Sequence, residues 1–93
     1  MPVKTTLGVV QAVKSLIQAG WCQKKSRIVK RDGSVSYCLR GAFQPFDESE
    51  WGAFWHWCLS IDISSPFSYN DARGRTKEDI LDLLSAYESE VSR

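Results

Sequence analysis

The sequence predicts an α+β fold: an N-terminal helix, a two-stranded antiparallel β-hairpin, and then two to three helices packed in one small domain. Two observations favour this class. Apolar residues recur at helical spacing in three segments, which begin at about Leu7, Asp47 and Thr76. Between the first two segments, a stretch rich in β-branched and aromatic residues surrounds Asp32-Gly33, a dipeptide typical of hairpin turns.

The length and composition limit the chain to a single domain. Its 93 residues suffice for one core, at about positions 5–91, and leave no room for a second. The beginning, Met1 to Lys4, lacks the apolar run of a signal peptide, and no segment approaches the roughly 20 apolar residues of a membrane span. We therefore expect one domain over residues 1–93, in the cytoplasm, with no membrane contact.

The N-terminal helix is expected from about Leu7 to Ala19. Thr5 and Thr6 are its candidate N-caps, and Gly20 is expected to end it at the C′ position. At 100° per residue the apolar side chains fall on one side of the helix, opposite a polar side. The apolar side comprises Val9, Val10, Val13, Leu16 and Ile17, and the polar side comprises Gln11, Lys14, Ser15 and Gln18.

The hairpin is expected between Trp21 and Leu39. On its second strand Val35, Tyr37 and Leu39 alternate with Ser34, Ser36 and Cys38, which predicts that the first three form the apolar face. The first strand is less regular and strongly basic, with Lys24, Lys25, Arg27, Lys30 and Arg31.

This basic hairpin has two interpretations. Lysines on an edge strand keep it from pairing with other chains. Alternatively, the same five cations could contact phosphates, as a nucleic-acid-binding wing does. Charge is also divided along the chain, because residues 1–46 hold eight Lys or Arg against one acid, whereas residues 47–93 hold four against ten acids. That division indicates either a surface for nucleic acid or an acidic partner on one side, or two halves that pack with complementary charges.

The second half is expected to be helical. A short helical turn from Arg40 to Phe43 should stop before Pro45, because the residue preceding a proline is disfavoured in the α region. Asp47 should then cap the next helix, with Glu48 and Glu50 in its first turn. The stripe expected to form the centre of the core is Trp51, Phe54, Trp55, Cys58 and Leu59. The region from Ser60 to Ser68 lacks any period and is expected to be a loop.

The last helix has the clearest start signal in the chain. Thr76 should cap it by accepting a hydrogen bond from the Asp79 N–H, while the Asp79 carboxylate reaches back to the cap. Asn70, Asp71 and Gly74 are residues that favour turns, so a tight turn is expected to lead from Tyr69 into the helix. The apolar side of this helix comprises Ile80, Leu81, Leu83, Leu84, Tyr87 and Val91.

Three motifs occur in order along the chain: Gly20-Trp21-Cys22-Gln23, Cys38-Leu39-Arg40-Gly41-Ala42, and Asn70-Asp71 followed by Gly74-Arg75-Thr76. With these motifs the chain resembles a family of short bacterial and phage proteins that is a domain of unknown function. The match extends from about Leu7 to Tyr87, and Tyr69 stands where members usually have Trp. The resemblance implies the order of segments and a bacterial or phage origin, and it transfers no catalytic residues.

No arrangement of residues signals catalysis or a cofactor. Cys22, Cys38 and Cys58 lack a Cys-x-x-Cys pair, and they are expected to be buried thiols. Together with His56 they could supply four metal ligands, but without the tight spacing of a structural zinc site, so we predict no metal. Cys58 and His56 lie about 160° apart on one helix, which argues against a nucleophile and base pair.

A second catalytic candidate is the group formed by Asp71, Arg73 and Arg75. Asp71 and Arg75 could bind a small anion, although an internal ion pair that holds the turn explains them equally well.

The remaining pointer to function is Trp57, about 130° from the centre of the predicted buried stripe. It either fills a gap against the Ser60–Ser68 loop or stands exposed with His56 as an anchor for a partner. We therefore expect a non-enzymatic protein-binding module without cofactors, whose partner is a larger bacterial protein or complex. As a phage-derived chain it could inhibit a host protein by occluding it. The alternative is a small nucleic-acid-binding regulator that uses the basic hairpin.

Overall fold

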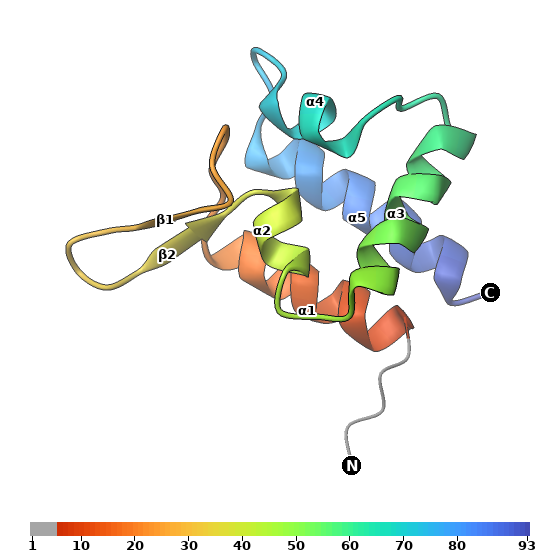
Figure 1. The fold of residues 1–93 in the computed structure, drawn as a ribbon, viewed down its shortest axis with the longest axis horizontal. Coiled ribbons are helices and arrows are strands. Elements are labelled where there is room, and N and C mark those ends of the chain that lie inside the picture. Colours follow the sequence, from red (N-terminus) through yellow and green to blue (C-terminus); the bar gives the residue numbers. More distant parts are fainter. Residues whose placement is uncertain (1–5) are drawn as a thin grey trace.

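The fold follows the predicted α+β order (Figure 1). The structure is a computed structural model that describes residues 6–93. Its elements are α1 (Thr6–Ala19), β1 (Arg27–Val29), β2 (Val35–Tyr37), α2 (Leu39–Phe43), α3 (Glu48–Ser60), α4 (Pro66–Asp71) and α5 (Lys77–Val91). The helices gather into one body, from which the β1–β2 hairpin projects to one side (Figure 1).

The core lies between α1 and α5, which run antiparallel along each other, and the side chains of α2 and α3 complete it (Figure 1). The faces expected from helical spacing are the buried ones. The buried side chains of α1 and α5 are Val9, Val10, Val13, Ile17, Ile80, Leu83, Leu84 and Tyr87. The candidate cap Thr5 lies outside the described residues, and Thr6 is the first residue of α1.

Gly20 ends α1 for a different reason from the expected one. Its φ is not positive, so it does not occupy the left-handed C′ position. A Cβ at Gly20 would lie 2.8 Å from Ser36 Oγ and 2.9 Å from the Val35 carbonyl oxygen. The glycine therefore allows β2 to lie against the end of α1.

The face of β2 that points inward is the opposite of the predicted one. Ser36 is 5% exposed and Cys38 is buried, whereas Val35 and Tyr37 are only half-buried. The prediction from hydrophobic alternation was wrong because the side of β2 that carries Ser36 meets the backbone at Gly20, where only a small side chain fits. Leu39 does not belong to the strand but begins α2. The turn itself is as expected, with Gly33 at φ +89° and with β1 paired antiparallel to β2.

The short helix α2 ends at Phe43, before Pro45, as predicted, but Gln44 keeps helical dihedrals, with φ −57° and ψ −34°. The expected displacement of the residue before proline does not occur. Instead, the helix stops because Pro45 has no N–H to donate to the preceding turn. Asp47 caps α3 as expected, since its side chain accepts from the Ser49 N–H at 3.0 Å.

The loop predicted from Ser60 to Ser68 is partly wrong, because α4 begins at Pro66 within it. Ser65 caps α4 by accepting from the Ser68 N–H, and Pro66 occupies the first turn, where its missing N–H costs nothing. Asn70 and Asp71 therefore end a helix and do not form the predicted turn. Only Gly74, at φ +81°, takes the left-handed conformation expected there.

The N-terminus of α5 is as predicted. Thr76 Oγ1 accepts from the Asp79 N–H at 3.2 Å, and Asp79 Oδ2 accepts from the Thr76 N–H at 3.0 Å. These two bonds form a capping box, so two of the otherwise unpaired N–H groups at this end are satisfied.

Candidate functional site

The three sequence motifs, far apart in the chain, meet at the side chain of Asn70, at the end of α4. Asn70 is only 2% exposed. Its Oδ1 accepts from Trp21 Nε1 at 2.8 Å and from the Leu39 N–H at 3.1 Å. Its Nδ2 donates to the Cys22 carbonyl at 3.2 Å and to Asp71 Oδ1 at 2.9 Å. One amide side chain thus joins the segment after α1, the start of α2 and the end of α4.

The same junction holds residues 23–26, which we call the lysine loop. Asp71 Oδ1 accepts from the Lys24 N–H at 2.8 Å, and Lys24 has a φ of +69°, which is uncommon for a residue with a side chain. Gln23 Nε2 donates to the carbonyls of Asn70 and Ala72 at 3.0 and 3.1 Å. These hydrogen bonds fix the backbone from which the Lys24 and Lys25 side chains extend.

The far end of the lysine loop is fixed by close packing on α2. The Cys38 N–H donates to the Ser26 carbonyl at 3.1 Å, and Cys22 Sγ donates to the Lys25 carbonyl at 3.4 Å. A Cβ at Gly41 would overlap the Ser26 carbonyl oxygen, so only glycine permits this approach. The second motif therefore supplies the Cys38 N–H as a hydrogen-bond donor to the loop, and its Gly41 leaves the space that the Ser26 carbonyl occupies.

Asp71 and Arg75, considered above as an internal ion pair, have separate partners. Arg75 Nε donates to the Tyr69 carbonyl at 2.8 Å, and its guanidinium lies 3.7 Å from the centre of the Tyr69 ring. Asp71 Oδ1 is bonded to Lys24 and Asn70. The aromatic ring at position 69 therefore stacks on Arg75, and Asp71 supports the lysine loop.

A small cavity of about 140 Å³ lies between the lysine loop, α2 and α4, and we call it the lysine pocket. Its walls include Leu39, Phe67, Lys24, Lys25, Arg40 and Asp71. Arg40 is paired, because its Nη2 lies 2.9 and 3.0 Å from the two carboxylate oxygens of Glu48 and its guanidinium lies over the Trp51 ring. Across residues 6–93, no hydrogen bond or ion pair engages the ammonium groups of Lys24 and Lys25.

Next to this pocket lies an apolar area on α3 and α4, which we call the aromatic surface: Trp51, Trp55, Leu59 and Phe67. The Phe67 ring centre lies 5.5 Å from those of both Trp51 and Trp55, and the two tryptophans are 5.8 Å apart in an edge-on arrangement. Phe67 is 45% exposed and Leu59 is 51% exposed. The expectation that Leu59 belongs to the buried stripe is therefore wrong: Leu59 lies on the exposed side of α3, whereas its neighbour Cys58 is fully buried.

Trp57, the predicted binding anchor, is half-buried against the core. Its ring centre lies 5.0 Å from that of Tyr87 on α5 and 6.0 Å from that of Phe54. It does not stand exposed, and its ring contacts are with Phe54 and Tyr87. His56 beside it is exposed. Binding by Trp57 and His56 stays a prediction, but the ring contacts give Trp57 a packing role.

The five cations of the basic hairpin lie on the surface. All of them are exposed, as are all three residues of β1. Lys24 and Lys25 precede β1 and belong to the lysine loop, whereas Lys30 and Arg31 lie at the hairpin tip. The cluster named in the sequence is thus divided among a fixed loop beside a pocket, Arg27 on β1 and a projecting tip.

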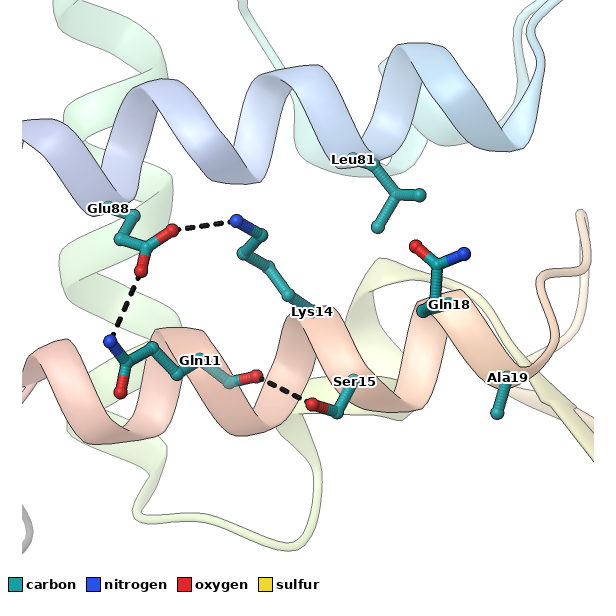
Figure 2. Close-up of a pocket in the computed structure, with 7 residues that line it drawn as sticks. All are labelled: Gln11, Lys14, Ser15, Gln18, Ala19, Leu81 and Glu88. Carbon is teal, nitrogen blue, oxygen red and sulfur yellow. Dashed lines mark hydrogen bonds and ion pairs between the residues drawn. The ribbon is translucent and has the colours of Figure 1, made fainter.

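A larger and more open groove lies between α1 and α5 (Figure 2). Its polar groups bond to one another: Lys14 Nζ lies 2.7 Å from Glu88 Oε1, and Gln11 Nε2 donates to Glu88 Oε2 at 3.2 Å. Hydrogen bonds from Lys14 and Gln11 lower the pKa of Glu88 below its usual value. We interpret this groove as part of the α1–α5 packing, since its charged groups are already paired.

The cysteines are buried and free, as expected. Burial raises the pKa of Cys58 to about 11. The pKa of Cys22 is also raised, mainly by burial and less by the charges of the nearby Cys38 and Asp71. These shifts are opposite to the lowered pKa that a nucleophilic thiol needs. Within the described part of the chain, no three His, Cys, Asp or Glu side chains are placed to hold a metal ion.

Comparison with known proteins gives a family without an assigned role. A family model described as "Family of unknown function (DUF6197)" matches residues 1–90. No curated protein matches the chain. No solved structure matches it either. In residues 6–93, none of the helices has the length and apolar character required to span a membrane.

Proposed function

The chain belongs to this family of unknown function, DUF6197, and we propose that it is a small protein-binding module whose contact area is the aromatic surface of α3 and α4. The observation that carries the proposal is the exposure of Phe67 and Leu59. Phe67 contacts the rings of both Trp51 and Trp55, and Leu59 lies on the same face of α3 as these two tryptophans. Exposed apolar clusters of this kind are characteristic of interaction sites, and aromatic side chains dominate binding energy there.

The position of the aromatic surface differs from the one first considered at Trp57. On α3, Trp51, Trp55 and Leu59 follow one another at four-residue spacing, so they lie on one face of the helix. Phe67 on α4 extends this face sideways toward α2. A partner segment laid along α3 would therefore meet Phe67, Leu59 and the half-buried Trp55, while Trp51, only 7% exposed, packs against Phe67 from the core.

Such a module can act by occluding a site on a larger protein. The resemblance to short bacterial and phage proteins supports that role, since a phage-derived chain of this size would act by covering a site on a larger host protein. An inhibitor of a host protein in the bacterial cytoplasm is the form of the function that we propose.

Selection of random peptides displayed on phage tests the proposal, because it requires no identified partner. We expect enriched peptides to bind the wild-type protein and to lose binding to Phe67→Ser and Leu59→Ser. Val29→Ser is the matched control, because Val29 is 61% exposed but lies on the hairpin, away from the aromatic surface. If no peptide is enriched, or if Phe67→Ser binds as well as wild type, the proposal is wrong.

A nucleic-acid-binding regulator remains the second candidate, favoured by the exposure of all five cations of the basic hairpin. We expect only weak binding to generic duplex DNA. Submicromolar binding at about 0.15 M salt, lost when Lys24, Lys25, Arg27, Lys30 and Arg31 are neutralised, would replace the protein-binding proposal with this one.

A further inference from the structure

We propose that the lysine pocket receives an acidic side chain of the protein partner, so that the partner segment carries Asp or Glu next to the apolar residue that meets Phe67. This inference rests on the proposed function and names the chemistry of the partner. The pocket and the aromatic surface share Phe67, so one short segment can occupy both.

The charge of the pocket favours an anion. Arg40 is neutralised by Glu48, and Asp71 already accepts two hydrogen bonds on Oδ1. Lys24 and Lys25 remain as cations whose ammonium groups engage nothing among residues 6–93. An incoming carboxylate could therefore bind the ammonium groups of Lys24 and Lys25. The nearby carboxylate of Asp71 already accepts hydrogen bonds from the protein.

The lysine loop is held in place before any partner arrives. Asp71 fixes the Lys24 N–H, Cys22 Sγ bonds the Lys25 carbonyl, and the Cys38 N–H bonds the Ser26 carbonyl. Lys24 also keeps a left-handed backbone, and non-glycine residues hold such a conformation only where their surroundings enforce it. A loop ordered in advance loses less entropy on binding, which suits a recognition site.

The size of the cavity selects the ligand. Sites for small molecules and cofactors are typically about 300–1,000 Å³. At about 140 Å³ the lysine pocket is too small for a nucleotide or cofactor but can take one side chain. Its apolar walls, Leu39 and Phe67, suit the methylene groups of Asp or Glu, while the two lysines meet the carboxylate.

The test uses peptides enriched on the whole 93-residue chain and measures their affinity by isothermal titration. We expect most of them to contain an acidic residue beside an aromatic or aliphatic one. Lys24→Asn/Lys25→Gln should weaken their binding about tenfold, and asparagine is chosen at position 24 because it tolerates a positive φ. Replacing the acidic residue of the peptide by its amide should give a similar loss with wild-type protein.

The matched control is Lys30→Asn/Arg31→Gln, which makes the same change in net charge at the hairpin tip. It should change affinity less than about twofold, since the tip is remote from the pocket and its effect is long-range and screened by salt. Amide NMR signals of residues 23–26 should shift on titration with the peptide. An equal loss for both double variants would show general attraction by positive charge and would overturn the pocket.

The outcomes separate the two proposals. Enriched peptides that bind at Phe67 but lack acidic residues, or that bind the Lys24→Asn/Lys25→Gln variant undiminished, overturn the acidic-residue inference and leave the protein-binding module standing. Failure to enrich any peptide on the wild-type protein overturns the module itself, and the inference with it. Urea unfolding of each variant confirms that it is folded, which is expected because both lysine side chains are exposed.

Discussion

At the scale of single residues, the side chain of Asn70 connects several separate segments of the chain through its hydrogen bonds. It uses its oxygen for two donors and its amide hydrogens for two acceptors, all within one buried side chain. Sequence reasoning placed it in a turn, because asparagine is common in turns. Nothing local in the sequence indicated that its partners were Trp21, Cys22 and Leu39.

Asn70→Ala should lower the free energy of unfolding by about 3 kcal/mol or more, since each buried group left without a partner costs about 1–3 kcal/mol. Asn70→Asp is the matched isosteric variant. It keeps the acceptor but places a second carboxylate beside Asp71 and removes the donor to Cys22. Its loss of stability should shrink as pH falls, because a protonated carboxyl group can donate again. Urea midpoints across the acid range measure both effects, and a neutral Asn70→Ala would contradict the role assigned to this side chain.

Thr76→Ala should destabilise the protein by about 0.5–2 kcal/mol, because α5 loses the capping-box hydrogen bond that Thr76 Oγ1 accepts from the Asp79 N–H. Thr76→Ser keeps the hydroxyl and serves as the control, with a change close to zero. A shift of the urea midpoint that cannot be distinguished from zero for the alanine variant would remove the cap from the account of stability.

At the scale of elements, α3 contacts more of the molecule than its sequence pattern predicts. Trp51, Phe54 and Cys58 face the core, Trp55 meets Phe67 of α4, and Trp57 meets Tyr87 of α5. The expectation that Trp57 lies away from the buried stripe assumed that α3 has a single packing face. Both are half-buried, because α4 and α5 lie on different sides of the helix.

Trp55→Ala and Trp57→Ala should therefore differ in function more than in stability. Each should cost about 1–3 kcal/mol, below the 3–5 kcal/mol typical of a fully buried aromatic residue. Trp57→Ala should be the more damaging of the two, since it exposes Phe54 and Tyr87 of the core, whereas Trp55→Ala should abolish binding of the enriched peptides. Trp57→Phe retains a ring and is the control. If Trp57→Ala loses peptide binding while remaining as stable as wild type, Trp57 is the anchor after all.

The sequence predicted the long helices, the hairpin and α2, but it missed α4 and the inward face of β2. The faces of α1 and α5 follow from periodicity over many residues, and both are buried as expected. The helix α4 has only six residues, too few to show a period. Its signal was Ser65 followed by Pro66, a cap and a first-turn proline, which could have identified it. The inward face of β2 could not be predicted, because it depends on a backbone contact at Gly20.

At the scale of the whole molecule, the division of charge along the sequence is used in packing. Lys14 and Arg40, from the basic half, pair with Glu88 and Glu48 of the acidic half at 2.7 and 2.9 Å. These pairs support complementary packing as one use of the charge division. The lysine loop and the hairpin tip retain positive charge at the surface, which is available for a partner.

The Lys14–Glu88 pair should make stability depend on pH. Because the pKa of Glu88 is lowered in the folded state, its contribution is present above the unfolded pKa of glutamate and is lost as pH falls through the lowered folded value. Glu88→Gln should remove this part of the acid dependence and cost about 0.2–1 kcal/mol near neutral pH, the range of exposed ion pairs. Urea midpoints at neutral and acid pH measure it. If stability falls with acid pH as steeply in Glu88→Gln as in the wild type, Glu88 does not contribute to the acid dependence.

The hydrogen bonds of Asn70 also bear on the order of folding. Its partners Trp21 and Cys22 lie 49 and 48 residues away in sequence, so their bonds form only after the intervening chain has closed into a loop. We expect these directional bonds to form after the less specific apolar pairing of α1 with α5. Removing them should leave the refolding rate almost unchanged and accelerate unfolding, which corresponds to a φ-value near zero for Asn70. The hydrogen bonds that position the lysine loop would then form last in folding, and they would set the unfolding rate and so the lifetime of the folded chain.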